Sequence, residues 1–492
     1  MLKKIFHIAF GAFIAILFIF SSCRKDETIS SDPSLKLSFS TDSVLFDTVF
    51  TTMGSVTKRL MVYNPNENSV VISKVSLAGG SNSPYSVNID GASGSSVRDI
   101  EIGGNDSLYV FVRVTVDPVN GNLPLVVKDS LIFETNGNMQ DVDLLAWGQD
   151  AHFILPNPDD FIEGLPPFSY IGQNNEEVHW TNDKPYVIVG YAVVDSAHLT
   201  IDAGCRIHFY NRSGLWIYRY SSITVNGTIE EPVVFQGVRL EQSYQDVPGQ
   251  WDRIWINESE TNSIFNYAII KNATIGIQAE TFKGGLGNTL LLNNTQILNS
   301  QGWGLFSRFY TIEGNNLLVA NSGSSLVNLT SGGNYRFKNS TFANYWRYDV
   351  RKDPSLHLAN YYIYHNGEEE EVYIGDLEAY FGDCIFYGNV DNEILIDKYP
   401  ESTTAFNYQF DYCLLKAVDT QDDFFTNCVF NEDPLFIDPS ENNYHIDTLS
   451  PVIKIGIPMG NPFDLDGIER TEKPDLGAYQ WVPKTDDLFH FR

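Results

Sequence analysis

The sequence predicts an all-β protein in which a β-sandwich precedes a solenoid of parallel strands. Residues 35–150 alternate short strand-like runs with Gly, Asn, Asp and Pro, as the strands and turns of a sandwich do. A six-residue phrase that ends in Asn then occurs four times between residues 263 and 344. Self-similarity at a fixed period indicates a solenoid, in which each repeat buries its apolar face against the next. The four copies are Tyr267–Asn272, Asn294–Asn299, Asn316–Asn321 and Asn339–Asn344.

Each copy of the phrase has strand character, with β-branched and aromatic residues and no helical apolar face. The apolar residue two places before the closing Asn recurs with spacings of 27, 22 and 23 residues. These spacings predict a parallel β-helix with one phrase per coil. The next match, Phe386, follows 44 residues after the last of them, which we interpret as two coils. The four aligned residues are Ile270, Ile297, Val319 and Phe342.

The closing Asn residues are expected to lie one above another along the axis of this helix. Neighbouring strands are about 4.8 Å apart, a distance at which stacked amides can donate and accept hydrogen bonds as a ladder. We interpret their role as structural rather than as ligand contact. The ladder residues are Asn272, Asn299, Asn321 and Asn344.

The composition narrows the classes of partner. A chain of 492 residues is long enough for two or more domains. Its 62 acidic and 32 basic residues give a formal charge of −30. Binding to nucleic acid or to anionic lipid by charge needs clustered Lys and Arg, so we expect no nucleic-acid partner. We interpret the excess carboxylates as a means of solubility rather than as a cation-binding surface.

The first residues have the organisation of a signal sequence. Lys3 and Lys4 precede an apolar run over residues 5–20, which is short for a membrane span and suits a signal peptide. The small residues before Cys23 resemble a bacterial lipoprotein signal. The resemblance implies that residues 1–22 are removed and that Cys23 is lipidated, with palmitate, at the head of a flexible tether over residues 23–34.

The charged residues that follow Cys23 bear on the compartment. Arg24–Glu27 resembles the short signal that directs lipoproteins of Bacteroidota-type bacteria to the cell surface. This resemblance implies an outer-membrane protein that is lipid-anchored and faces the cell exterior.

Residues 35–150 predict an immunoglobulin-like (Ig-like) β-sandwich, because several short strands at this spacing fit about 115 residues. Phe46–Ser55 followed by Leu60–Asn64 resembles the Ig-like domains of the ASPM/SPD-2/Hydin class, which implies a spacer or protein-binding module. Residues 151–185 are rich in Pro and less regular. We expect them to form a linker or an N-terminal cap over the exposed solenoid end.

Residues 186–430 are assigned to the β-helix, with an excursion at 345–379 that interrupts the repeat. Leu199–Gly204 and Pro232–Gly237 resemble the opening coils of bacterial right-handed parallel β-helix proteins. The fold class is therefore an N-terminal Ig-like sandwich followed by a right-handed parallel β-helix (solenoid).

The C-terminal residues resemble a choice-of-anchor Q ending, which implies that residues 431–492 form the last coils and a C-terminal cap. In this cap, Asp466 and Gly467 make a turn, Arg470 pairs with carboxylates and Tyr479 covers the apolar end. Asp464 and Asp466 are candidate Ca²⁺ ligands, although the rest of an EF-hand spacing is missing; no other cofactor is expected. The resemblance rests on Asp433–Asp438, Asp464–Arg470 and Pro474–Gln480.

Four cysteines follow Cys23. They form no Cys-x-x-Cys and no His/Cys cluster, which argues against zinc. Three of them precede apolar pairs, and we expect these to point inward and stack as small hydrophobes. A disulfide stays open, because sequence does not settle the pairing. The cysteines are Cys205, Cys384, Cys413 and Cys428.

An enzymatic role has little support in the repeats. Cleavage of a glycosidic bond needs two carboxyl groups held a few ångströms apart on one face. The adjacent acidic pairs, such as Asp159–Asp160 and Asp422–Asp423, lie outside the regular repeats. We therefore expect a non-catalytic protein; if it is an enzyme, a polysaccharide lyase or glycoside hydrolase is the class.

Aromatic clusters at the breaks in the repeat are the candidate binding residues, since such side chains can stack on sugars or anchor a protein partner. We expect a scaffold or interaction lipoprotein that binds other outer-membrane or envelope proteins. The alternative is a protein that binds or degrades carbohydrate. The candidates are Trp251, Trp255, Trp303, Trp346, Tyr348, Tyr361 and Tyr364.

Overall fold

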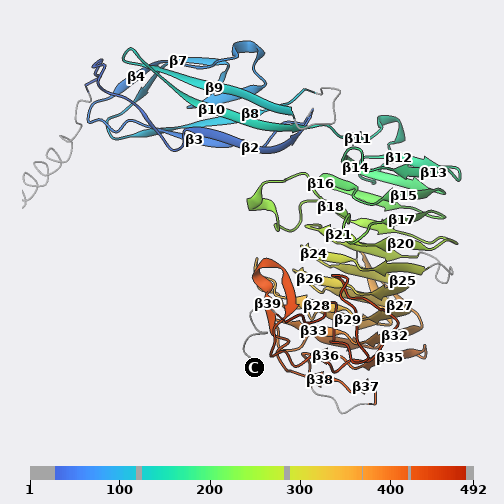
Figure 1. Cartoon of the computed structure of the whole chain (residues 1–492). Helices are drawn as coiled ribbons and strands as arrows, with labels where there is room; N and C mark the ends of the chain where they lie inside the picture. The colour runs from blue at the N-terminus through green and yellow to red at the C-terminus, as the bar shows by residue number, and fades with distance from the viewer. Residues whose placement is uncertain are drawn as a thin grey trace, which may run out of the picture. The chain divides into compact units, whose positions relative to one another are not determined.

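The computed structural model describes residues 28–51, 53–117, 125–281, 289–367, 369–418 and 423–483, and the chain divides into two compact units at Asp150 and Ala151 (Figure 1). The signal peptide predicted at residues 1–22 and the lipidated Cys23 lie outside the described residues. Both units are β structure, and the described helices are four single 3-10 turns. These turns are Gly80–Asn82, Pro158–Asp160, Gln242–Tyr244 and Pro439–Glu441.

The first unit is a β-sandwich of two five-stranded sheets. Inward and outward residues alternate along each strand, and the inward ones of both sheets form a single hydrophobic cluster that includes Leu60, Val110 and Phe133. One sheet has the order β1 (Ser38–Phe39), β3 (Lys58–Tyr63), β8 (Ser107–Val114), β5 (Tyr85–Ile89) and β6 (Ala92–Gly94). The other has the order β2 (Ser43–Phe50), β10 (Asn138–Gln149), β9 (Leu125–Thr135), β4 (Val70–Leu77) and β7 (Ser96–Ile102).

Residues 28–34, expected to belong to a flexible tether, are bonded to this sandwich. Ile29 makes a parallel bridge to Ser69. The side chains of Asn136 and Asn138 donate to the carbonyl groups of Asp32 and Pro33 at 3.0 and 2.7 Å. Because backbone groups of residues 29–33 are bonded to the sandwich in this way, this part of the predicted tether is not free.

The second unit contains a 26-stranded sheet, which we call the parallel stack, because its strands pair in parallel (Figure 1). Its strands are β11 (His152–Ile154), β12 (Phe168–Gln173), β13 (Glu177–Trp180), β14 (Tyr186–Asp195), β15 (His198–Asp202), β16 (Arg206–Ile217), β17 (Ser222–Asn226), β18 (Val233–Gly237), β19 (Ile254–Ile256), β20 (Ser263–Asn266), β21 (Ala268–Lys271), β22 (Ile277–Glu280), β23 (Thr289–Asn293), β24 (Gln296–Ser300), β25 (Leu305–Asn315), β26 (Leu318–Ser322), β27 (Val327–Lys338), β28 (Thr341–Asn344), β29 (Leu356–Ala359), β32 (Leu377–Gly382), β33 (Ile385–Gly388), β34 (Ile394–Asp397), β35 (Phe406–Asp411), β36 (Leu414–Leu415), β37 (Phe425–Thr426) and β38 (Val429–Phe430).

The repeat read from the sequence sets the register of the stack. Ile270 pairs with Ile297, Ile297 with Val319, and Val319 with Phe342, each on the next strand of one column. The predicted alignment of these four residues is therefore confirmed. Phe342 then pairs directly with Phe386, so the 44-residue spacing is one long repeat and our interpretation of two coils was wrong.

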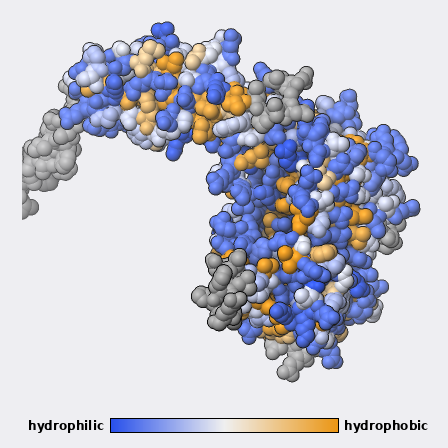
Figure 2. Space-filling view, viewed as in Figure 1, coloured by the Kyte–Doolittle hydropathy of each residue, from blue (hydrophilic) through white to orange (hydrophobic). Residues whose placement is uncertain are grey.

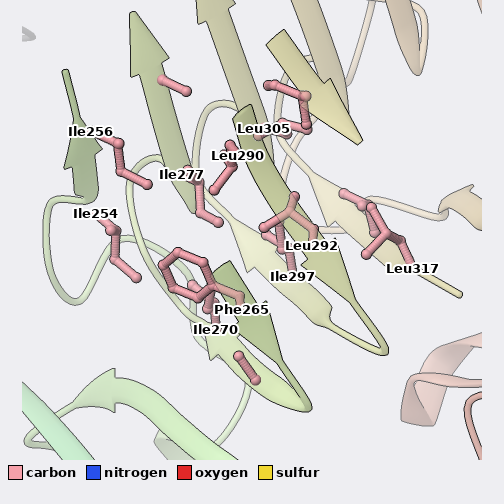
Figure 3. Packing of buried hydrophobic residues seen from close by; sticks show 14 of the residues in the cluster. Ile254, Ile256, Phe265, Ile270, Ile277, Leu290, Leu292, Ile297, Leu305 and Leu317 are labelled. Atoms are coloured by element: carbon pink, nitrogen blue, oxygen red, sulfur yellow. The ribbon is translucent and has the colours of Figure 1, made fainter. Parts of the chain in front are cut away.

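The core of the stack is a continuous apolar column between the strands. Inward residues from successive repeats, such as Ile254, Ile277 and Leu305, point toward one another (Figure 3). Each fully buried side chain of this kind contributes roughly 1.5–3 kcal/mol. Cys205, Cys384 and Cys413 belong to the same cluster, Cys428 packs against it, and all four are free thiols.

Two boundaries differ from those predicted. Residues 151–185, expected to be a linker or cap, contribute β11, β12 and β13, which pair with β14 and β15. The excursion expected at 345–379 includes β29, which pairs within the stack. After β29 the chain leaves the sheet again to form an antiparallel hairpin of β30 (Tyr361–Asn366) and β31 (Glu369–Ile374), and it returns at β32.

Residues 431–483, which we call the cover segment, were predicted to cap the end of the solenoid and instead pack against its side. Leu465 and Tyr479 contact outward-facing residues of β24 and β26, and Val452 and Leu476 contact those of β33 and β36. The physical reason is that the outward side chains of these strands are apolar, and removing apolar surface from water is favourable. The covered residues are Leu298, Leu318, Ala320, Ala343, Ile385 and Leu414. The cover segment contains β39 (Phe436–Asp438) and β40 (Asn443–Ile446).

Arg470 and Gly467 have specific roles within the cover segment. Gly467 has φ of +80° in the turn after Asp466, a conformation that favours glycine. Arg470 was expected to pair with carboxylates; the charges of Asp464, Asp383 and Asp475 act on its guanidinium, which donates to Asn316 Oδ1 at 2.9 Å and to the Gly477 carbonyl at 3.0 Å. It therefore fastens the segment to the turn between β25 and β26 and to its own last turn.

Candidate binding surface

Among the outward sides of the parallel stack that the cover segment does not seal, we call the one on β16, β19, β22, β25, β27 and β29 the open face. It is carried by β16, β19, β22, β25, β27 and β29, whose alternate residues point into the core. The residues between them face outward and pair in register from strand to strand. In order along the stack these are Trp216, Trp255, Gln278, Phe306, Asn328 and His357. Hydrophilic residues occupy most of the visible surface of the molecule, with separate hydrophobic areas on both units (Figure 2).

Aromatic rings form two stacks on the open face. Trp216 and Trp255 lie 4.5 Å apart between ring centres, with planes 6° from parallel. Trp303 and Phe306 lie 4.8 Å apart, and Phe306 lies 6.4 Å from Tyr362 of the hairpin. Such ring pairs add about 0.5–1.5 kcal/mol beyond the area they bury, so this part of the surface is rigid.

A buried carboxylate lies between the two aromatic stacks. Glu280 accepts hydrogen bonds from Trp255 Nε1 at 2.7 Å, Gln278 Nε2 at 2.8 Å and Arg308 Nε at 2.7 Å. The guanidinium carbon of Arg308 also lies 4.7 Å from the ring centre of Tyr362. Glu280 is thus held by an ion pair and two neutral donors, an arrangement that orients the aromatic rings.

Asn328 and His357 differ from these groups because they carry unpartnered atoms. Among the described residues, Asn328 Oδ1 and His357 Nε2 have no hydrogen-bond partner. The Nε2 atom is 3.8 Å from Asp397 Oδ2, beyond hydrogen-bond distance. Asp397 accepts from the Tyr361 hydroxyl at 2.6 Å. Burial lowers the pKa of His357, which leaves its imidazole neutral near pH 7.

The hairpin β30–β31 forms the edge of the open face. Tyr362 and Tyr373 are directly opposite each other across the hairpin, and Tyr362 packs against Phe306 and Arg308. Tyr364 and Tyr373 are 46% and 44% exposed. The Tyr373 hydroxyl donates to Glu371 at 2.6 Å. The hairpin therefore presents aromatic side chains beside acidic ones.

The structure brings four of the predicted binding residues to this region: Trp255, Trp303, Tyr361 and Tyr364. The other three are elsewhere. Trp251 is buried in the core, stacked 4.1 Å from Phe209 with its Nε1 donating to the Lys271 carbonyl, so the prediction that it contacts a ligand is wrong. Trp346 is also buried, with its Nε1 bonded to Asp349, and Tyr348 is exposed but donates to the Asp246 carbonyl.

The predicted Asn ladder serves mainly to fasten segments that cross the stack. Asn321 donates to Asn299 at 3.4 Å, but Asn272 donates to the Gln245 carbonyl and Asn344 to the Ser324 carbonyl. Three of the four have φ between +55° and +67°, a left-handed bend that Asn tolerates better than most residues. A ladder that the sequence analysis missed runs through Asn266, Asn293 and Asn315, with amide bonds of 3.0 and 3.1 Å.

The candidate Ca²⁺ ligands are engaged by the protein itself. Asp464 accepts from the backbone N–H groups of Asp466, Ile468 and Gln480. Asp466 lies 2.6 Å from His445 Nε2. Within the described ranges, no three His, Cys, Asp or Glu side chains converge in a way that could hold a metal ion.

Glu280, Arg308, Asn328 and His357 were missed by sequence reasoning. No local motif marks them, because their proximity depends on register between strands that are 22–29 residues apart. If the register of the inward residues had been extended to the outward positions of each strand, these four residues would have been placed together.

No family model and no curated protein matches the chain. A protein of unknown function from Porphyromonas gingivalis W83 is 17% identical over 28% of this chain and 59% of its own, less than two thirds of its length, with a TM-score of 0.18. The PapD-like domain 7 of human CEP192 is 14% identical over 26% of this chain and 94% of its own, with a TM-score of 0.17. A family 123 glycoside hydrolase from Clostridium perfringens is 8% identical over 30% of this chain and 31% of its own, with a TM-score of 0.18. At these TM-scores the likenesses carry no information about function.

No helix in the part of the chain that the structure describes is both long and apolar enough to cross a bilayer.

Proposed function

We propose that this protein is a surface-exposed outer-membrane lipoprotein that binds other envelope proteins and catalyses no reaction. In this proposal the sandwich is an Ig-like spacer, and the parallel stack is a right-handed parallel β-helix, or solenoid, that presents the binding surface. The anchor is supported by the sequence alone, through Lys3, Lys4, the apolar run and Cys23.

The observation that carries the proposal is the hairpin β30–β31. Most of the extra length of the 44-residue repeat goes into this hairpin and the segment before β29, whereas the preceding repeats need 22 to 27 residues. The hairpin forms its own two-stranded sheet, so no strand of the stack depends on it for pairing. It exposes Tyr364, Val372 and Tyr373. Exposed aromatic side chains of this kind are enriched at the energetically important centres of protein interfaces.

Binding without catalysis is supported by the state of the acidic groups on and near the open face. Glu258 is paired with Arg219 at 3.1 Å, and Asp252 with Arg253 at 2.9 Å. Glu280 is engaged by three donors. Acid–base cleavage of a glycan needs two carboxyl groups that face the substrate, and we propose that these paired carboxylates orient neighbouring side chains instead.

Affinity capture from native membranes tests the proposal. The wild-type protein is expected to co-purify with a defined envelope protein, and a Tyr364→Ser/Tyr373→Ser variant to recover at least tenfold less of it. Tyr210→Ser is the matched control, since Tyr210 on β16 is also 46% exposed and lies outside the hairpin; its yield should equal that of the wild type. Absence of any defined partner, or undiminished capture by the double variant, would contradict the proposal.

A further inference from the structure

Three of the four thiols in the described part of the chain lie in one column at the last turns of the parallel stack. Cys384, Cys413 and Cys428 each come directly before a strand, and these strands, β33, β36 and β38, pair in register. The Leu414 N–H donates to the Cys384 carbonyl at 2.9 Å, and the Val429 N–H donates to the Cys413 carbonyl at 2.8 Å. The three cysteines are therefore neighbours on successive turns.

The sulfur atoms of this column occupy the same position on each turn. Each Sγ donates to the carbonyl of a phenylalanine on the preceding turn, at 3.7 Å for Cys384 and 3.4 Å for Cys413 and Cys428. The Cys413 thiol is also hydrogen-bonded to the thiols on both sides of it. Neighbouring strands are about 4.8 Å apart, and a disulfide joins residues whose Cα atoms are about 4.4–6.8 Å apart. Each neighbouring pair of thiols is thus within reach of a bridge.

The two possible bridges differ in their access to solvent. Cys384 and Cys413 are fully buried, whereas Cys428 is partly exposed. The hydrogen bond from Cys413 lowers the pKa of the Cys428 thiol, while burial raises the pKa of Cys413. The thiolate is the nucleophile in disulfide exchange. Cys428 is therefore the first of the three to react with a reagent from solvent, and its thiol neighbour is Cys413.

The last turns of the stack are short and lie at its end. The strands β36, β37 and β38 have two residues each, at the end of the stack remote from β11 (Figure 1). β38 pairs with β36, and no later strand of the described chain extends the stack beyond it. The cover segment packs against the side of the stack. Terminal elements with few contacts open locally at little cost in free energy, so a covalent link is most effective here.

We propose that Cys413 and Cys428 form a disulfide that locks the last turn of the stack. The Cys428 thiolate attacks one sulfur of a small disulfide such as oxidised glutathione, and the first glutathione leaves as a thiol. Cys413 then attacks the Cys428 sulfur of this mixed disulfide and releases the second glutathione. The two protein thiols give up two electrons and two protons, which reduce the glutathione disulfide to two thiols. Since a bridge needs Cβ atoms about 3.5–4.5 Å apart, β38 moves slightly closer to β36.

This inference goes beyond the proposed protein binding. In the cell it rests on the proposed location outside the cytoplasm, where disulfides form and persist. The test below supplies its own oxidant, so its result does not depend on that location, and capture of a partner by the hairpin does not depend on the disulfide.

The test treats the purified full-length protein with oxidised glutathione, alkylates the remaining thiols in denaturant and maps the tryptic peptides without reduction. Cleavage after Lys398 and Lys416 places the three cysteines in separate peptides, so the pairing is read directly. We expect the peptide of Cys413 linked to that of Cys428, with Cys384 alkylated. A link between Cys384 and Cys413, a link between two molecules, glutathione retained on Cys428, or no link at all would overturn the proposal.

Hydrogen exchange tests whether the bridge locks the last turn. The Val429 N–H, which donates to the Cys413 carbonyl, should exchange at least tenfold more slowly after oxidation. Cys428→Ala should abolish both the link and this slowing. Cys205→Ala is the matched control, because Cys205 is also buried but faces Val233 rather than a thiol; it should keep both. Equal exchange in the oxidised and reduced wild type would contradict the lock.

Discussion

Two of the outward sides of the parallel stack belong to the same repeats but differ in what covers them. On β24, β26 and β33 the outward residues are apolar, and the cover segment packs on them. On β19, β22 and β25 they are Trp255, Gln278 and Phe306, and Tyr362 of the hairpin packs beside Phe306. The type of the outward residue in each repeat therefore decides whether the chain covers that side. Apolar residues recruit the cover segment, whereas beside the aromatic and hydrogen-bonding residues lies the hairpin that we propose binds partners.

The largest expected effect comes from the buried ion pair of Arg351 and Glu393. Arg351 lies in the segment between β28 and β29, and its guanidinium contacts both Glu393 oxygens, at 2.8 and 2.6 Å, with both side chains fully buried. Arg351→Met leaves the Glu393 carboxylate buried without its counterion. We expect a loss of about 3–5 kcal/mol in the free energy of unfolding, measured by urea denaturation.

The control for this prediction is Arg347→Met. Arg347 is exposed and donates to the Ser440 carbonyl at 2.8 Å, so its loss should cost less than about 1.5 kcal/mol. An equal cost for both variants would show that the buried pair does not lock the segment between the two sides.

A leucine on each side gives a direct comparison of the covered and open surfaces. Leu318 on β26 faces the cover segment and is 1% exposed, whereas Leu395 on β34 continues the row of the open face and is 39% exposed. We expect Leu318→Ala to cost about 2–5 kcal/mol and Leu395→Ala less than about 0.5 kcal/mol. Similar costs in urea denaturation would mean that the cover segment does not seal its side.

Asp383 should make the contact with the cover segment sensitive to pH. It is buried, accepts from the Ile457 N–H at 3.1 Å, and burial raises its pKa to about 7. The folded protein therefore holds a proton that the unfolded chain releases near pH 3.8. This contribution to stability is complete below that pH and is lost as the pH rises through about 7.

We expect the free energy of unfolding to fall between pH 5 and 7 by up to about 1.4 kcal/mol per pH unit from this group. Asp383→Asn keeps an acceptor for Ile457 and removes the titration, so its slope over the same range should be flatter. Denaturation curves at several pH values would measure both slopes. Parallel slopes would show that Asp383 stays ionised throughout.

The inward column could be predicted from the sequence because it recurs at a nearly constant period, as Ile270, Ile297 and Val319 do. The 44 residues before Phe386 could not be resolved, since an extra repeat and an inserted hairpin have similar lengths. Trp251 and Trp346 were misplaced because a Trp residue alone does not reveal whether it faces the core or solvent.

The open and covered sides could not be told apart from sequence for a related reason. Outward Leu298 and Leu318 resemble their inward neighbours in type, so nothing local marks them as a docking side for residues more than a hundred positions later. The pairing of Asn328 with His357 likewise needs the register across a 29-residue repeat, which only the assembled strands define.

We propose that the hairpin side receives partners while the cover segment closes the side of β24, β26 and β33. Photo-crosslinking in intact cells tests it most directly, with a photoreactive amino acid in place of Tyr364 on the hairpin or of Ile437, which is exposed on the cover segment. We expect a discrete crosslinked envelope protein from position 364 and none from position 437. Crosslinks from position 437 with none from position 364 would contradict it.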